Sequence, residues 1–321
     1  MLIVRAAYAL VFGECLMPKP SISMAVCTYN RCAMLKDAVQ SLLEQSVLRD
    51  PDQIWEIIIV DNNSTDDTPA YLKELSQTNP DIRCFIETSQ GSAYTRSAAF
   101  NNARHDIIAY IDDDETADQD WAKEIIRVFA ENDNVGCVGG PVLLEEQDKE
   151  RIPKWFSKDM YSIIGEVHLP VKTTDYVESM DGTGVVGGNM ALSRAVREYG
   201  LSFPGVGRSG NLLLCDEDGL MARNISAAGF RVFLAPRAKA THKFLPERAT
   251  VKHAVRYYKG MAYTRYVPYK LPYYVICLFY RILSFPLMVL FSYRKRLKHF
   301  ARICYEYYRI QASLLFYMRR K

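Results

Sequence analysis

The sequence lacks the cysteine patterns of a metal-binding or disulfide-rich protein. Its eight cysteines are spread from Cys15 to Cys304 and include no C-x-x-C pair and no regular spacing. We interpret them as reduced thiols in a cytosolic chain. This excludes a disulfide framework and a cysteine zinc site.

The chain also has little net charge. Forty Lys and Arg against 37 Asp and Glu leave a formal charge of +3, too small to indicate nucleic acid as a partner. Acidic residues concentrate before about residue 220, whereas Lys and Arg crowd the C-terminal end. The 49% hydrophobic and 24% charged content is that of a globular protein and excludes wholesale disorder.

A convincing secretory signal is missing from the N-terminus. The apolar run there is short, Arg5 interrupts it, and no small-residue cleavage site follows. Met17 is an alternative start. We therefore treat residues 1–17 as an extension that need not be native.

What the sequence does contain, from residue 18 onward, is an alternation of strand-like and helix-like segments. Short runs of β-branched residues, such as Ile57–Val60, alternate with stretches whose apolar residues have helical spacing. This alternation predicts an α/β fold with a mostly parallel sheet. It stops at residue 151, where Gly-rich and irregular segments begin.

Three of the predicted strands end in polar clusters: "CTYNR" from Cys27, "VDNNSTDDT" from Val60 and "IDDDE" from Ile111. In open α/β sheets, ligands bind beyond the carboxyl ends of the strands. We therefore expect the three clusters to converge on one site.

The third cluster places Asp112, Asp113, Asp114 and Glu115 directly after an apolar run. Burying like charges side by side is costly. Clustered carboxylates become favourable when they share a divalent cation, and hard oxygen ligands suit Mg²⁺ or Mn²⁺ together with substrate phosphates. The pattern therefore predicts a metal-bridged diphosphate.

Taken together, the motifs resemble those of inverting family 2 glycosyltransferases, which have the GT-A fold. The similarity covers roughly residues 18–260 and keeps the family's order. It rests on the three clusters above and on the segments "GSAYTRSAAFNNA", "GGNMALSR" and "CDEDGLMARNISAAGFRVFLAPRAKATHK".

The resemblance implies a role for each matching position. A metal ion, Mg²⁺ or Mn²⁺, would bind at Asp112, Asp114 and His242. The nucleotide-sugar donor would be held by residues at the strand ends and the Gly…Arg helix: Thr28, Tyr29, Asn30, Arg31, Asp61, Asn63, Arg96, Asp112 and Asp113. The segment "TRS" replaces the family's more usual "ARN" around Arg96.

The catalytic base would come from the acids Glu217 and Asp218, in a helix that Gly229 closes. The motif here is "CDED" where the family more often has Gly-Glu-Asp. Asp216 therefore stays a third candidate for the base. His242 follows the next predicted strand.

The implied domain organisation is a GT-A catalytic domain over residues 18–250, with a nucleotide and metal half (18–145) and an acceptor half (146–250). Its implied activity is metal-dependent transfer, with inversion, from a nucleoside-diphosphate sugar to a hydroxyl of a glycan or lipid-linked acceptor. UDP-sugar is the expected donor, and cell-surface or extracellular polysaccharide or glycolipid assembly the expected setting. A nucleotidyltransferase and a non-catalytic nucleotide-sugar sensor are the alternatives.

Two other features admit competing interpretations. Matches to G-x-G-x-x-G start at Gly182 and Gly205, but neither opens the first strand–helix unit, so we do not expect a dinucleotide there. Trp121 lies in a helical pattern and is expected in the core. Trp155 is equally compatible with a structural role and with a wall of the acceptor site.

The C-terminal region, residues 251–321, is basic and aromatic. Its apolar stretch from Leu271 is about long enough to span a bilayer, but Arg281 and Pro286 interrupt it. We expect a helical segment that lies on the membrane surface and places the protein at the cytoplasmic face. A membrane-spanning hairpin and a helical cap on the catalytic domain are the alternatives.

Overall fold

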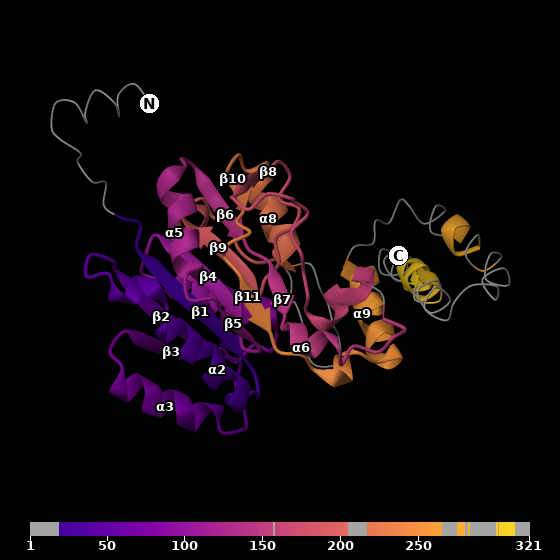
Figure 1. Ribbon diagram of the computed structural model, residues 1–321, viewed down its shortest axis with the longest axis horizontal. Coiled ribbons are helices and arrows are strands. Elements are labelled where there is room, and N and C mark those ends of the chain that lie inside the picture. The colour runs from indigo at the N-terminus through magenta and orange to yellow at the C-terminus, as the bar shows by residue number, and fades with distance from the viewer. Residues whose placement is uncertain are drawn as a thin grey trace, which may run out of the picture.

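The structure is a computed structural model that describes residues 19–156, 158–204 and 217–264, and near the C-terminus residues 275–279, 282, 300 and 302–311. An eight-stranded sheet forms the centre of the larger part (Figure 1). Its strand order is β3-β2-β1-β4-β9-β6-β10-β8. The strands are β1 (Ile22–Thr28), β2 (Trp55–Asp61), β3 (Ile82–Ile86), β4 (Ile107–Asp112), β6 (Val135–Gly139), β8 (Val177–Ser179), β9 (Asn189–Ser193) and β10 (Arg231–Leu234).

The sheet is mostly parallel, as predicted. Strands β1 to β4 pair in parallel, and so do β6 and β10. Strand β9 lies antiparallel between β4 and β6, and β8 is an antiparallel edge strand. The alternation in the sequence predicted the α/β class, and the structure confirms it.

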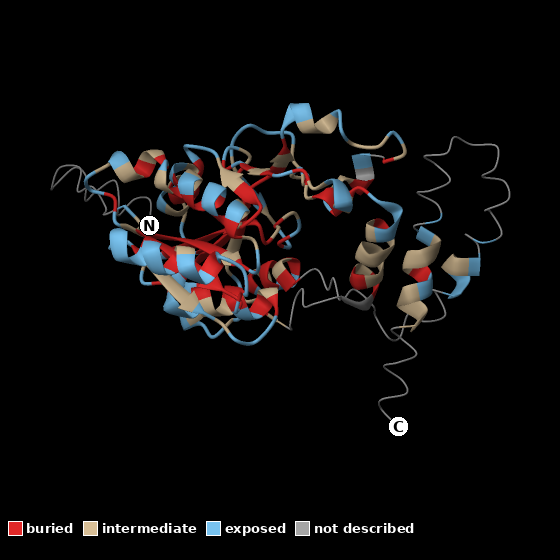
Figure 2. Cartoon of the chain, turned by 90° about the horizontal axis from the view of Figure 1, so that it is seen from below, coloured by how far each residue is buried: buried red, intermediate tan, exposed pale blue. Residues whose placement is uncertain are grey.

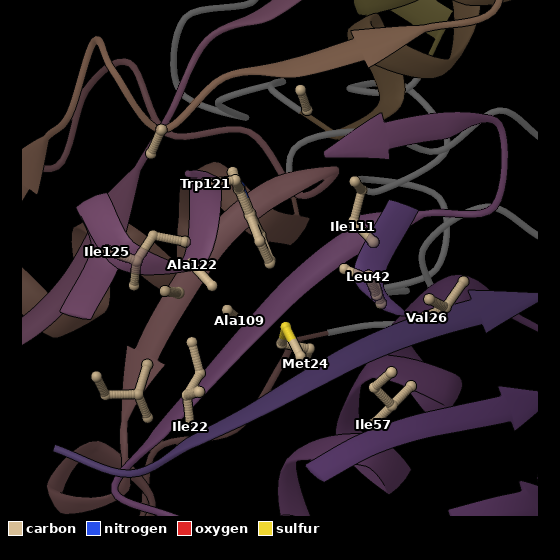
Figure 3. Close-up of a cluster of buried hydrophobic side chains, with 14 of the residues drawn as sticks. Ile22, Met24, Val26, Leu42, Ile57, Ala109, Ile111, Trp121, Ala122 and Ile125 are labelled. Atoms are coloured by element: carbon tan, nitrogen blue, oxygen red, sulfur yellow. The ribbon is translucent and has the colours of Figure 1, made fainter. Parts of the chain in front are cut away.

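Helices cover both faces of the sheet because each strand alternates its side chains between two apolar clusters. One cluster joins Ile22, Met24 and Val26 to helices α2, α3 and α5 (Figure 3). The other joins Ala25 and Ile58 to α4, α7 and α8. The helices are α2 (Cys32–Leu43), α3 (Thr68–Thr78), α4 (Ser92–Asn102), α5 (Trp121–Glu131), α7 (Arg194–Glu198) and α8 (Glu217–Ala227).

Trp121 belongs to the first of these clusters and is fully buried, which confirms the prediction that it is a core residue. Its indole Nε1 donates to Asn189 Oδ1 at 2.8 Å. The Asn189 side chain in turn donates to the carbonyls of Pro141 and Ala238. The buried polar groups of both side chains are therefore paired.

A second, three-stranded sheet lies beside the first and is ordered β5 (Glu115–Ala117), β11 (Ala240–His242), β7 (Val142–Leu144). The apolar segment "VGCVGGPVLL" divides at Gly140 and Pro141 into β6 and β7, which belong to different sheets. Proline has no amide hydrogen to continue a ladder. The register of β11 on β5 sets His242 opposite Glu115.

The remaining elements up to residue 264 are short, apart from α9. They are η1 (Ser46–Arg49), α6 (Glu146–Lys149), η2 (Lys158–Ile164), η3 (Pro246–Arg248) and α9 (Val251–Thr264). A third apolar cluster, which includes Phe156, Met160, Ala249 and Ala254, packs α9 against η2 and η3. Trp155 packs at the edge of this cluster, 4.8 Å from Phe156 between ring centroids. Buried residues are concentrated around the large sheet, as Figure 2 shows.

Much of the expected membrane-associating segment, including residues 265–274 and 283–299, lies outside the described part of the chain. Within the described part, no helix is both long and apolar enough to cross a bilayer. The N-terminal extension and the "GVGRSG" segment from Gly205 also lie outside the described residues.

Candidate active site

The first and third polar clusters meet beyond the ends of β1 and β4, as the sequence predicted. Thr28 Oγ1 donates to Asp113 Oδ2 at 2.8 Å. Arg31 Nη1 lies 2.8 Å from Asp113 Oδ1 and 2.9 Å from Asp114 Oδ2. Parallel strands end at the same edge of a sheet, which brings these residues together although more than 80 positions separate them.

The second cluster joins the first through a pair of turns. Ser64 Oγ accepts from the Asn30 amide at 2.8 Å, and Asn30 Oδ1 accepts from the Thr65 amide at 2.7 Å. Asn30 and Asn63 have φ angles of 52° and 61°, a left-handed conformation that asparagine tolerates better than most residues. Asp61 is buried and accepts from both the amide and the hydroxyl of Ser64.

The acidic run at the end of β4 forms a compact oxygen cluster. Asp112, Asp114 and Glu115 each offer a carboxylate oxygen, and these oxygens all lie within 4.8 Å of one another. Burial raises the pKa of Glu115 well above its usual range, and the charges of Asp112 and Asp114 raise it further. Three hard oxygen donors at this spacing fit Mg²⁺ or Mn²⁺, because a divalent cation would relieve their repulsion.

Asp113 is not a member of this group, and its carboxylate accepts from Thr28 and Arg31. Its burial raises its pKa to about 6, although the Arg31 charge opposes the shift. Of the three consecutive aspartates, the first and third therefore contribute to the oxygen cluster, and the second ties the β4 end to β1.

Asp114 is held by basic side chains from two directions. Besides Arg31, its Oδ2 accepts from Arg248 Nη2 at 2.6 Å and lies 3.5 Å from His242 Nε2. Burial alone would raise the pKa of Asp114, but the adjacent His242 and the charges of Arg248 and Arg31 together hold it well below the usual range. Asp114 is thus a buried carboxylate in its charged form.

Arg96 connects the oxygen cluster to the acids of α8. Its Nη2 lies 2.8 Å from Asp112 Oδ1, and its Nη1 lies 2.9 Å from Glu217 Oε1. Ser92, one turn earlier on α4, donates to the same Glu217 oxygen at 2.8 Å. The two acidic motifs therefore share one buried guanidinium.

Glu217 and Asp218 differ in what their carboxylates contact. The oxygens of Asp218 accept from the backbone amides of Gly187 and Gly219, whereas Glu217 is paired with Arg96. Burial and the neighbouring Glu217 charge raise the pKa of Asp218 above the usual value. A raised pKa is one of the properties that a general base needs. Asp216, the third candidate, lies outside the described residues.

Two glycines before β9 allow these groups to approach closely. A Cβ on Gly187 would lie 2.8 Å from the Arg96 guanidinium, and a Cβ on Gly188 would lie 2.4 Å from Glu115 Oε1. The backbone of the segment "GGN" thus lies close to the oxygen cluster and to the Arg96 bridge, that is, the Arg96 guanidinium that pairs with both Asp112 and Glu217.

Most of the predicted site residues lie at this sheet edge. Tyr29 and Asn63 are exposed on the same loops. Glu115 was not among the predicted metal ligands, and neither Ser92 nor Arg248 was among the predicted site residues. The acidic run pointed to Glu115, but no local pattern marks the other two.

Comparisons with known proteins identify the family of the chain. Glycosyl transferase family 2 matches residues 23–200, which is more than half of the chain. The chain therefore belongs to glycosyl transferase family 2 and is a glycosyltransferase of the GT-A fold.

Two relatives illustrate the range of the similarity. A glucosyl-dolichyl phosphate glucuronosyltransferase of Haloferax volcanii is 25% identical over 71% of this chain and 70% of its own length. A GalNAc(5)-diNAcBac-PP-undecaprenol beta-1,3-glucosyltransferase of Campylobacter jejuni is 27% identical, over 44% of this chain and 45% of its own length. The second match thus covers less than half of either protein.

Solved structures share the fold at low sequence identity. A mannosyltransferase from Pyrobaculum calidifontis, in complex with GDP-Man and Mn²⁺, aligns with a TM-score of 0.54 and 18% identity over 98% of this chain and 80% of its own. GalNAc-T7 with UDP, GalNAc and Mn²⁺ aligns with a TM-score of 0.52 and 15% identity over 70% of this chain and 43% of its own.

Proposed function

We propose that the protein transfers a sugar from a nucleoside-diphosphate sugar to a hydroxyl of a glycan or lipid-linked acceptor, with inversion at the anomeric carbon. UDP-sugar is the preferred donor class, and assembly of a cell-surface or extracellular polysaccharide or glycolipid is the setting. The observation that carries this proposal is the Arg96 bridge, because it fixes the oxygen cluster and the acids of α8 in one site.

The donor's diphosphate would be held at the oxygen cluster with Mg²⁺ or Mn²⁺ on Asp112, Asp114 and Glu115. When bound there, such an ion neutralises the charge that develops on the leaving diphosphate. Both structural neighbours named above were solved with Mn²⁺, which supports the assignment. His242, 3.5 Å from Asp114, stays a candidate for contact with the ion or the diphosphate.

Asp218 would remove the proton from the acceptor hydroxyl as that oxygen attacks the anomeric carbon. A hydroxyl is a weak nucleophile, and a positioned carboxylate with a raised pKa lowers this barrier. The amides of Gly187 and Gly219 fix the orientation of the Asp218 carboxylate. Glu217 would hold Arg96 in place, and the same ion pair would fix the first turn of α8.

The proposed acceptor class is supported by the relatives and by the C-terminal composition. The two relatives named above carry a dolichyl phosphate and a diphospho-undecaprenol in their names. A lipid-linked acceptor would be met at a membrane surface, where the basic, aromatic residues beyond residue 250 would anchor the protein at its cytoplasmic face.

The test is a screen for transfer and donor hydrolysis with UDP-, GDP- and dTDP-sugars in the presence of Mn²⁺. Asp218→Asn should lower the turnover about 10²–10⁴-fold and leave donor binding intact. Glu217→Gln should lower turnover and donor affinity together, because it also loosens Arg96. A nucleoside triphosphate turned over with release of pyrophosphate, or full turnover in Asp218→Asn, would overturn the proposal.

A further inference from the structure

One carboxylate oxygen in the site is shared by three basic side chains. Asp114 Oδ2 lies 2.9 Å from Arg31 Nη1, 2.6 Å from Arg248 Nη2 and 3.5 Å from His242 Nε2. The side chains of Asp114 and His242 are each only 3% exposed, and that of Arg248 is 11% exposed. Asp114 also belongs to the oxygen cluster that fits a divalent cation.

These two roles of Asp114 conflict. A guanidinium within hydrogen-bond distance of a ligand oxygen repels a cation on that oxygen, and burial strengthens the repulsion. A donor bound with its cation also brings a diphosphate whose oxygens need cationic partners. Arginine suits phosphate oxygens because its planar fork can donate two hydrogen bonds to them.

Arg31 and Arg248 differ in how they would respond. Arg31 also lies 2.8 Å from Asp113 Oδ1, so it keeps a carboxylate partner when Asp114 turns to another. Arg248 reaches the same oxygen of Asp114 from the end of η3, and its Nη1 lies 2.7 Å from His242 Nε2. Arg248 is thus the side chain whose pairing with Asp114 can be exchanged.

The backbone at Arg248 is fixed, so the exchange would be a movement of the side chain. Ala249, the next residue, is buried in the third apolar cluster together with Phe156 and Met160. The adjacent β11 is anchored by its register on β5 and β7. Arginine has four rotatable side-chain bonds, which lets the guanidinium turn while its Cα stays in place.

We propose that Arg248 is a diphosphate-binding residue whose guanidinium exchanges its contact with Asp114 for the diphosphate when the donor binds. This inference rests on the proposed function and adds a residue to it. Arg248 competes with a cation that binds alone, but it cooperates with a cation that arrives with a diphosphate. The two effects have opposite signs, which makes the proposal testable.

The experiment compares the full-length wild type with Arg248→Met and Arg248→Lys. Binding of Mn²⁺ alone is measured from the electron paramagnetic resonance signal of the free ion. Binding of inorganic pyrophosphate at saturating Mn²⁺ is measured by calorimetry, which avoids any assumption about the donor's base. Lys243→Met is the matched control, since Lys243 lies on the same loop and its side chain pairs with Asp37.

For Arg248→Met we expect Mn²⁺ alone to bind severalfold more tightly and pyrophosphate to bind about tenfold or more weakly. Arg248→Lys keeps the charge and loses the fork, so its affinities should lie between these and the wild-type values. Lys243→Met should match the wild type in both measurements. Circular dichroism shows whether each variant folds, and Arg248→Lys serves alone should Arg248→Met fail to fold.

Three outcomes would overturn the inference: weaker binding of both ligands, which indicates a structural role; tighter binding of both; or no change in either. Loss of affinity for a polyprenyl phosphate without loss for pyrophosphate would also overturn it, in favour of an acceptor-binding role. If the wild type transfers sugar and Arg248→Met binds pyrophosphate normally, this inference fails alone. If the wild type binds no nucleoside diphosphate, the proposed function fails.

Discussion

Arg96 and Glu217 lie 121 positions apart in the sequence and form a buried ion pair, with Nη1 of the arginine 2.9 Å from Oε1 of the glutamate. Each side chain is less than 10% exposed. The same guanidinium reaches Asp112. The position of the acids on α8 therefore depends on the carboxylates at the end of β4. A substitution in one of these two motifs should displace side chains of the other.

Removing Arg96 should destabilise the fold strongly. Arg96→Met leaves Glu217 buried without its charge partner, a loss that typically costs about 3–5 kcal/mol. Urea unfolding measures this cost directly. The control is Arg194→Met, which breaks an exposed pair with Glu198 and should change the free energy of unfolding by less than about 1 kcal/mol. Equal effects in the two variants would show that the buried pair carries no special weight.

Mn²⁺ should stabilise the folded protein through the oxygen cluster. A ligand present at 100 times its dissociation constant raises the free energy of unfolding by about 2.7 kcal/mol. Asp112→Asn should remove most of this gain in a thermal melt. The exposed Asp120→Asn should keep it.

Glu115→Gln should differ from Asp112→Asn in its effect on stability without metal. Because burial and two neighbouring charges raise the pKa of Glu115, its ionised form destabilises the empty protein at neutral pH. The variant should therefore be more stable than the wild type without metal and should gain less from Mn²⁺. A variant less stable than the wild type without metal would contradict this account of the cluster.

Gly188→Ala should weaken Mn²⁺ binding without any change in a ligand residue. The added Cβ would lie 2.4 Å from Glu115 Oε1, so the carboxylate must move away from its neighbours. We expect the affinity for Mn²⁺ to fall about tenfold or more, the equivalent of about 1.4 kcal/mol. Gly200→Ala is the control for backbone strain alone. Gly200 has a φ of 94°, which strains alanine, but nothing lies within 4 Å of its added Cβ, and it should leave the affinity unchanged.

The sequence predicted the part of the site that local pattern determines. The strand that ends at Asp112 is marked by its apolar run, and the rule that parallel strands end at one edge placed Thr28 and Arg31 beside it. The acids of α8 were found because their motif is contiguous. Each of these predictions needed only a segment and the fold class.

The missed residues depend on contacts between distant segments. Arg248 reaches Asp114 across 134 positions, and its segment "PERAT" looks like a surface turn in the sequence. The pairing of β5 with β11 places Glu115 in the site, and the composition of neither strand predicts this pairing. The antiparallel position of β9 between β4 and β6 was likewise not predictable from alternation, because the chain crosses back only after a long irregular segment.

Glu56 should make the stability of the fold sensitive to acid, at the end of the sheet opposite the site. Its carboxylate is buried and accepts from Ser23 Oγ at 2.7 Å, the Arg104 amide at 2.8 Å and Arg83 Nη1 at 2.9 Å. Burial would raise the pKa of Glu56, but these hydrogen bonds together lower it below the usual value of 4.5.

A carboxyl with a lowered pKa stabilises the folded state above its unfolded pKa and loses that contribution as the pH falls through the folded value. Glu56→Gln should therefore cost about 1.5–3 kcal/mol at pH 7, and the difference from the wild type should shrink below about pH 4.5. Urea unfolding at pH 7, 5 and 3.5 measures it, with the exposed Glu74→Gln as the control. A difference that stays constant down to pH 3.5 would mean that Glu56 acts through its shape and not through its charge.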